Sequence, residues 1–341
     1  MPIRSSRKSE TYFDFFSASG NETEPLPFIP KIFYGDRAVA GGGSDSDGDY
    51  QDDMYYYNIA STGNASQFGD IGTERIQVGA CSDSSRGLFW AGWFGNPSLG
   101  IGGIDNTIDY VTISTTGNAS NFGNLSQIRY GVGACASDVR GVGMGGDRQP
   151  HSPSPGVSNV MDYVTIQTTG SASDFGDATQ EIWLTGGCSN GVRGIWAGGR
   201  PPESTDVIQY ATIASTGNAT DFGDLEDGSE GIGACGSTEV SSRCVLGGGK
   251  ISGQPTNKIE YLNANTTGNG TDFGNLTVKR QGSAPSANGV RACWLGGYTD
   301  PSVQYSIDYV TIATTGNASD FGDNYGNQPR RFLGGTSGDA S

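Results

Sequence analysis

The chain has 341 residues, a net charge of −16 and 56 glycines. An acidic surface of this kind repels nucleic acid and favours solubility, and no window of about 18 apolar residues exists that could form a transmembrane helix. We therefore expect neither a nucleic-acid partner nor membrane insertion.

The cysteines narrow the chemistry further. The six cysteines include no Cys-x-x-Cys pair, which argues against a zinc ribbon. The N-terminal sequence lacks the apolar core of an ordinary signal peptide, so free thiols are expected. The sequence predicts no cofactor.

Residues 1–30 are predicted to form an extended N-terminal docking arm that binds another protein. They carry a basic patch, an aromatic run and then three prolines. The alternatives are a strand that covers the chain's own domain and a solvated tail, but a solvated tail would be poor in aromatic residues. The predicted partner-binding residues of the arm are Arg4, Arg7, Lys8, Tyr12, Phe13, Phe15 and Phe16.

Residues 31–341 contain a unit that occurs six times. Its most regular stretch is Asp-Tyr-Val-Thr-Ile-Ala-Thr-Thr-Gly-Asn-Ala-Ser-Asp-Phe-Gly-Asp at 308–323. The glycine of Thr-Gly-Asn recurs at intervals of 47 to 54 residues, and a period of this size is typical of arrays and propellers. The other copies are 55–70, 109–124, 162–177, 209–224 and 260–275.

Each unit is predicted to contain four strands. The Tyr-Val-Thr-Ile segment alternates apolar and polar residues and favours a strand, and the Phe segment returns beside it. Thr-Gly-Asn between them predicts a tight type II′-like hairpin turn. A strand that starts at an arginine and ends in Gly-Gly, or in Ala-Gly after Arg86, precedes each hairpin. A strand of small residues such as 78–82 follows the hairpin, which suits a crowded axis.

The order of these elements predicts how the domain ends. The chain starts on the arginine strand at Arg37 and finishes on a small-residue strand near 332–337. The last strand is therefore expected to complete the first blade. The predicted fold is all-β: a six-bladed β-propeller with four-stranded blades over residues 31–341, closed by the C-terminal strand joining the N-terminal blade.

The Gly-Gly pair, the tyrosine after it and the aromatic residue of the fourth strand resemble the kelch repeat family. The chain departs from that family in carrying Phe where kelch repeats usually carry Trp. The amino-acid sequence of the 308–323 stretch also resembles repeats in structural proteins of marine tailed bacteriophages, especially cyanophages. This resemblance implies a structural protein of the virion.

The segments between the Gly-Gly strand and the tyrosine strand differ most between units, and they are expected at the end of the blades opposite the Thr-Gly-Asn turns. Variable loops on a rigid scaffold commonly carry binding residues, although drift in unconstrained loops gives the same pattern. The predicted ligand-face residues are Trp93, Phe94, His151 and Tyr298.

Two metal sites can be considered. Asp45, Asp47 and Asp49 alternate like the start of a calcium loop, but no glutamate completes the pattern, so a solvated acidic loop is the alternative. Four cysteines recur at one position of the small-residue strands, where we expect buried hydrophobic side chains rather than a metal site because their sulfurs would lie too far apart. They are Cys81, Cys135, Cys188 and Cys235.

Catalysis has little support. His151 is the one histidine, and neither a Gly-x-Ser-x-Gly elbow nor a zincin motif occurs. Carboxylates could pair for glycoside hydrolysis, but most aspartates recur in every unit, whereas an asymmetric site needs residues that break the repeat.

The sequence thus predicts a non-enzymatic phage virion structural protein, assembled in the host cytoplasm and located on the virion. Its propeller would be displayed on the particle, and residues 1–30 would anchor it to another virion protein. A tail- or fibre-associated position and a capsid decoration both fit. The alternative is a carbohydrate-binding adhesin for a host-surface glycan, and a polysaccharide-degrading enzyme is less favoured.

Overall fold

The computed structural model describes residues 35–96, 101–148, 156–201, 203–235 and 242–340. The chain divides into two units, Met1–Pro30 and Lys31–Ser341. The first unit lies outside the described residues together with its seven predicted docking residues, so the docking arm stays a prediction. All of the described residues belong to the second unit.

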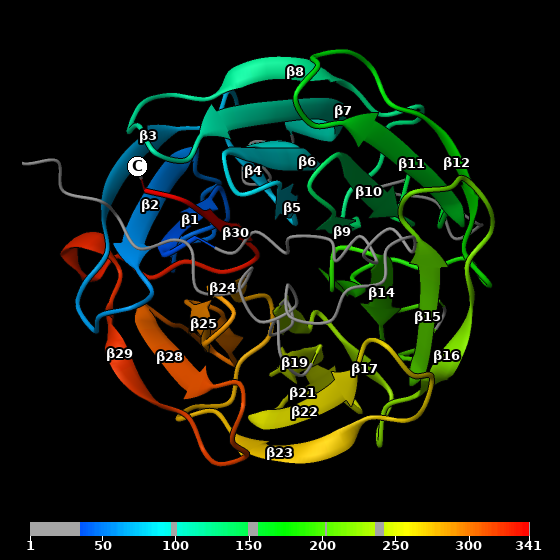
Figure 1. Cartoon of the computed structure of the whole chain (residues 1–341). Helices are drawn as coiled ribbons and strands as arrows, with labels where there is room; N and C mark the ends of the chain where they lie inside the picture. Colours follow the sequence, from blue (N-terminus) through cyan, green and yellow to red (C-terminus); the bar gives the residue numbers. More distant parts are fainter. Residues whose placement is uncertain (1–34, 97–100, 149–155, 202, 236–241, 341) are drawn as a thin grey trace, which may run out of the picture. The chain divides into compact units, whose positions relative to one another are not determined.

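The described part of this unit is all-β and propeller-like, built of antiparallel sheets, most of them four-stranded (Figure 1). The innermost strands are the predicted small-residue strands: β5 (Gly79–Ser82), β9 (Gly133–Ala136), β13 (Gly186–Ser189), β18 (Gly233–Cys235), β24 (Ala284–Ala287) and β30 (Gly334–Gly338). The second strands begin at the repeated arginine: β1 (Arg37–Gly41), β6 (Arg86–Asn96), β10 (Arg140–Met144), β14 (Arg193–Ala197), β19 (Arg243–Gly247) and β25 (Arg291–Leu295).

The outer half of each sheet is the predicted hairpin. The third strands carry the tyrosine: β2 (Asp53–Asn58), β7 (Ile101–Thr112), β11 (Val160–Thr165), β15 (Val207–Thr212), β22 (Lys258–Asn263) and β28 (Ser306–Thr311). The outermost strands carry the phenylalanine: β3 (Ser66–Asp70), β8 (Ser120–Asn124), β12 (Ser173–Asp177), β16 (Thr220–Asp224), β23 (Thr271–Asn275) and β29 (Ser319–Asp323). Short elements fill the connections: β4 (Arg75–Ile76), β17 (Ser229–Glu230), β20 (Lys250–Ile251), β21 (Gln254–Pro255), β26 (Tyr298–Thr299), β27 (Ser302–Val303) and the 3-10 turn η2 (Tyr325–Asn327).

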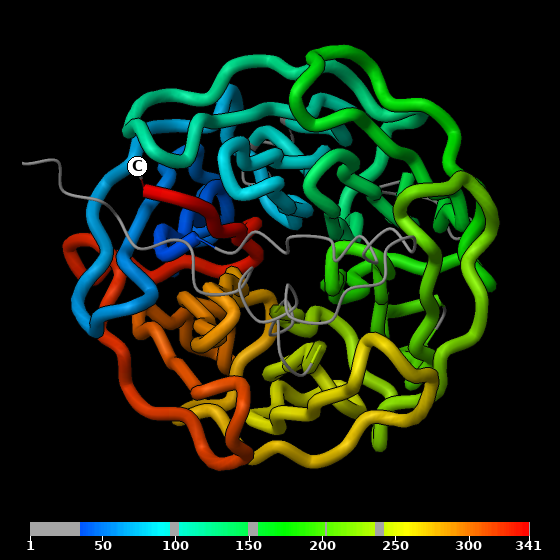
Figure 2. The backbone as a smooth tube through the Cα atoms, viewed as in Figure 1, coloured from blue at the N-terminus to red at the C-terminus, as the bar shows by residue number. Residues whose placement is uncertain are grey.

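The last strand of the chain completes the first sheet. β30 pairs antiparallel with β1 from Arg37 opposite Gly338 to Gly41 opposite Gly334, which gives the strand order β3-β2-β1-β30. Figure 2 shows the red C-terminal segment that contains β30 lying beside the blue segment that contains β1. The pairing predicted for the C-terminal strand is therefore present.

The innermost strands contact one another in turn. β5 contacts β9, and the series continues through β13, β18, β24 and β30, which contacts β5 again. Small residues are required there because the backbones approach closely. A Cβ on Gly187 would lie 2.4 Å from the Ala134 carbonyl oxygen.

A circle of backbone hydrogen bonds lies at one end of these strands. Each residue that precedes an innermost strand by two positions donates its N–H to the carbonyl of its counterpart in the preceding connection, at 2.6–3.0 Å. All six residues have φ between 54° and 67°, the left-handed region. Gln, Leu and Phe adopt this region only at a cost, which the circle of bonds offsets. The members are Gln77, Gly131, Leu184, Gly231, Gly282 and Phe332.

The repeated arginine and tyrosine join neighbouring sheets at the other end. In each of the six sheets that contain the repeated arginine, its guanidinium lies over the tyrosine ring of the same sheet, 4.2–4.9 Å from the ring centroid. Its Nη1 also donates to a backbone carbonyl of the next sheet, as Arg291 does to Ile59 at 3.2 Å. Each repeated arginine thus holds two sheets together.

The Thr-Gly-Asn segment has a role that the sequence did not reveal. The predicted type II′ turn at Gly-Asn is wrong: the tight turn comes earlier, as in the bond from the Ser61 N–H to the Asn58 carbonyl, and Gly63 is nearly extended at φ 158°. Instead, Gly63 N–H donates to the Phe321 carbonyl at 2.9 Å, and Asn64 Oδ1 accepts from the Asp323 N–H at 3.0 Å. Each Thr-Gly-Asn segment docks on the outermost strand of the preceding sheet, which is why its sequence is so uniform.

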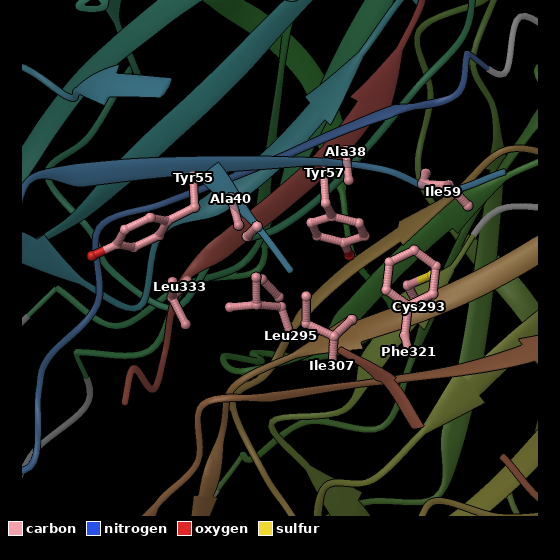
Figure 3. Close-up of a cluster of buried hydrophobic side chains, with 12 residues drawn as sticks. Ala38, Ala40, Tyr55, Tyr57, Ile59, Cys293, Leu295, Ile307, Phe321 and Leu333 are labelled. Carbon is pink, nitrogen blue, oxygen red and sulfur yellow. The ribbon is translucent and has the colours of Figure 1, made fainter. Parts of the chain in front are cut away.

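The hydrophobic core is divided between the sheets. One cluster packs the first sheet against the sheet that contains β25 and β28, with Tyr57, Leu295 and Phe321 among its buried members (Figure 3). The Tyr57 and Phe321 rings meet edge to face at 5.3 Å. The Tyr57 hydroxyl lies 2.7 Å from the Ser286 Oγ. The junction between the two ends of the chain is therefore packed like any other junction.

Buried ion pairs cross several junctions. The guanidinium of Arg129 meets the carboxylate of Asp162 at 2.6 Å, and both side chains are fully buried. Arg280 and Asp308 form the same pair at 2.9 Å. At the next junction the equivalent residues are the neutral Ile182 and Gln209, and Gln209 Oε1 accepts the backbone and hydroxyl bonds of Thr179 that Asp162 accepts from Ser126 elsewhere.

The neutral junction predicts how a charged junction can be replaced. Arg129→Ile alone should destabilise the protein by about 3–5 kcal/mol, because it leaves the Asp162 carboxylate buried without its cation. Adding Asp162→Gln recreates the Ile182/Gln209 arrangement and should restore most of that stability. Denaturant unfolding measures both variants, with the exposed Lys279→Ile as a control expected to change little. A double variant as unstable as the single one would contradict this account.

Candidate functional site at one end of the cavity

The innermost strands enclose a cavity of about 100 Å³. Every sheet contributes to its lining, chiefly through backbone and small side chains such as Ala80 and Gly187. All six members of the hydrogen-bonded circle line it as well. The cavity is thus small and lined mostly by backbone and apolar side chains, and the aromatic and charged side chains lie beside its end.

A band of twelve residues borders that end. In each unit, the residue directly after the Gly-Gly pair (Ala91-Gly92 in the second unit) faces, across an antiparallel bridge, the residue directly before the circle member. Residues opposite one another in an antiparallel pair point to the same side. We call these residues the mouth band: Ser44 with Arg331, Trp93 with Ile76, Asp147 with Tyr130, Arg200 with Trp183, Lys250 with Glu230, and Tyr298 with Gln281.

Three aromatic residues of the mouth band form what we call the aromatic arc: Trp93, Tyr130 and Trp183. The Tyr130 ring meets Trp93 edge-on at 5.2 Å and Trp183 at 5.4 Å. Tyr130 is buried and its hydroxyl donates to Asp147 Oδ2 at 3.1 Å. Burial raises the pKa of the Tyr130 hydroxyl, and the Asp147 carboxylate raises it further, so the phenol stays protonated. Both indoles are partly exposed.

Arg200, which faces Trp183, and the next pair, Glu230 with Lys250, carry charge, and we call these three residues the charged arc. The Glu230 carboxylate is buried and lies 3.5 Å from Arg200 Nε and 3.4 Å from Lys250 Nζ. The two basic side chains are 42% and 28% exposed. Two cations share one carboxylate, so this arc carries a net charge of about +1 in a protein of −16.

The remaining part of the mouth band is also ordered. The Arg331 guanidinium lies 4.8 Å from the centroid of the Tyr298 ring, and its Nε donates to Ser44 Oγ at 3.0 Å. The Tyr298 hydroxyl donates to Asp300 Oδ1 at 3.1 Å. Loss of solvent around the Tyr298 hydroxyl raises its pKa, and the hydrogen bond to the Asp300 carboxylate raises it further.

The structure brings together only part of the predicted ligand face. Trp93 and Tyr298 both lie in the mouth band. Phe94 follows Trp93 on β6, so its side chain points to the opposite face of the strand, and it packs near Gly103. His151 lies outside the described residues.

Sequence reasoning missed most of the mouth band, including Tyr130, Trp183, Arg200 and Glu230. A usable signal was present: the residue that follows the second-strand glycine differs in every unit, although that glycine itself repeats. The positions that break an otherwise regular repeat are the ones gathered at this end.

The acidic loop is stabilised by its own backbone. Asp45 Oδ1 accepts the N–H groups of Asp47 and Asp49, each at 3.0 Å, and Oδ2 accepts from Gln51 Nε2 at 2.9 Å. Asp47 and Asp49 are exposed. Asp45 therefore has a turn-forming role, and calcium binding by the three aspartates stays a prediction.

The cysteines behave as small buried side chains. All six are free and buried. Burial raises the pKa of the Cys81 thiol to about 12 and also raises the pKa values of Cys135 and Cys235. A hydrogen bond with Cys188, together with burial, raises the pKa of the Cys244 thiol.

No protein-family model matches the chain, and no curated protein sequence matches it. In the part of the chain that the structure describes, no helix has the length and apolar character needed to cross a membrane.

The thiols give a pH-dependent prediction. With a folded pKa of about 12 against about 8.5 unfolded, Cys81 should not react with a disulfide reagent in the native protein at pH 8. A raised acid pKa adds stability below the unfolded value, and that stability is lost as pH rises from about 8.5 towards 12. Thiol titration should find no fast-reacting cysteine before denaturation and six afterwards, and unfolding should become easier above pH 9. Rapid labelling of Cys81 in the folded protein would contradict this.

Proposed function

We propose that residues 31–341 form a closed six-bladed kelch-like β-propeller, and that the protein is a non-enzymatic structural component of a tailed-phage particle. The pairing of β30 with β1 supports closure, as do the cyclic contacts of the innermost strands. The sequence of the repeat resembles repeats in phage structural proteins, and this resemblance supports a location on the phage particle.

One observation carries the non-enzymatic proposal: the repeated polar side chains are used between the sheets. The arginines bind carbonyls of the next sheet, and the asparagines of Thr-Gly-Asn accept from the preceding one, as Asn317 does from Asn275. A catalytic site would need acids and bases outside the repeat. The two carboxylates of the mouth band are both engaged, Asp147 with Tyr130 and Glu230 with Arg200 and Lys250.

The proposed module is a rigid display unit. Its uniform end holds the sheets together, whereas its other end carries residues that differ in every sheet. Residues 1–30 would anchor it to another virion protein through the basic and aromatic residues of the arm, since exposed aromatic and arginine side chains dominate protein interfaces. A tail- or fibre-associated position and a capsid decoration fit equally well.

Deleting residues 1–30 tests the anchor. The truncated protein should keep the melting temperature of the full chain, because the described residues from 35 onward already join every pair of neighbouring sheets, yet it should be lost from purified particles. A full-length Trp183→Ala variant is the matched control and should be incorporated normally. If the truncated protein is incorporated at the level of the full chain, the anchoring role is wrong.

A further inference from the structure

We propose that the mouth band binds an acidic saccharide, with the aromatic arc packing on sugar rings and Arg200 pairing with a sugar carboxylate. This gives the carbohydrate-binding alternative a site and a ligand class, and it does not depend on the proposed anchoring to a particle.

The aromatic arc is rigid and continuous. Three successive sheets supply one aromatic side chain each, and Tyr130 fixes both indoles by its edge-on contacts at 5.2 and 5.4 Å. Tyr130 is itself held by its bond to Asp147. Fixed and partly exposed aromatic rings offer a large contact area at little cost in conformational entropy. The C–H faces of sugar rings pack on such surfaces.

The charge lies directly beside this arc. Arg200 faces Trp183 across the antiparallel bridge, so the two side chains point to the same side. Arg200 contacts Glu230 through Nε and keeps 42% of its side chain exposed. Among the described residues, no partner is present for its terminal nitrogens, and a guanidinium edge matches a carboxylate in a two-bond geometry.

The cavity size decides where the ligand lies. A volume of about 100 Å³ is well below the roughly 300–1,000 Å³ of pockets that enclose small molecules. The saccharide must therefore lie across the mouth band instead of entering the cavity. This requires an elongated ligand, in which one sugar stacks on Trp93 or Trp183 while an acidic neighbour reaches Arg200.

An acidic ligand also fits the distribution of charge. The protein as a whole carries −16 and repels anions. The charged arc opposes this locally, because Glu230 neutralises only one of its two basic neighbours. A neutral saccharide would leave the exposed guanidinium of Arg200 unused.

An oligogalacturonate and its fully methyl-esterified form test the proposal on the full chain, with calorimetry as the readout. The two probes share the sugar rings and differ in charge. The acid should bind, and the ester should bind about tenfold more weakly, since a charge-assisted pair contributes at least that much. Arg200→Gln should weaken binding of the acid to the level of the ester and leave the ester unaffected, whereas Trp183→Ala should weaken both.

Tyr325→Ala removes an exposed aromatic outside the mouth band and should leave binding unchanged. Melting temperatures establish that each variant is folded. If Trp183→Ala does not fold, Arg200→Gln still tests the proposal, because the Arg200 side chain is partly exposed. Equal binding of acid and ester, no binding of either, or binding unaffected by Arg200→Gln would overturn the proposal. None of these outcomes bears on whether residues 1–30 anchor the protein.

Discussion

The pairing of β30 with β1 is the constraint on which the rest of the second unit depends. A four-stranded sheet of this kind leaves its inner and outer edges open, and open edges invite pairing with other chains. Here the last strand of the chain takes the place beside β1 that the innermost strands occupy in the other sheets. Phe332, which leads into β30, is also a member of the hydrogen-bonded circle, so the circle is complete only when β30 is in place. The junction between the first and last sheets then carries the same arginine and glycine bonds as the other junctions. It also carries the asparagine bond that the other junctions have, except the one where Ser171 replaces the asparagine.

This organisation separates structure from recognition. The uniform end of the unit is specified by residues that occur in nearly every sheet, and those residues are engaged with neighbouring sheets. The mouth-band positions carry different side chains in each sheet, on backbone held in the same way by the second-strand glycines and the circle. Gly297 illustrates this: its N–H donates to the Arg330 carbonyl at 2.7 Å, directly before the band residue Tyr298. The same backbone arrangement therefore carries the aromatic arc in some sheets and the charged arc in the sheets beside them.

Much of the fold could be predicted from the sequence, because residues at the same position of the repeat occupy the same place in each sheet. The repeat pattern was sufficient to predict the strand classes, the small residues of the innermost strands and the return of the last strand to Arg37. The Gly-Asn segment was misread, since local turn chemistry suggested a hairpin, whereas its partners lie on another sheet about 40–50 residues away in sequence. The mouth band was largely missed for a related reason: Tyr130 and Arg200 have no distinctive neighbours in sequence, and only the bridges between distant segments bring them together.

Hydrogen exchange of the β30 amides tests the central claim most directly. If β30 is an integral strand of the first sheet, amides of Gly334–Gly338 that bond to β1 should exchange about as slowly as those of β9, Gly133–Ala136, because both open only when the unit unfolds. Peptides from the two strands can be compared in one deuterium-labelling experiment. Exchange of β30 at the rate of an unfolded segment, while β9 stays protected, would mean that the last strand does not close the structure, and it would contradict this account.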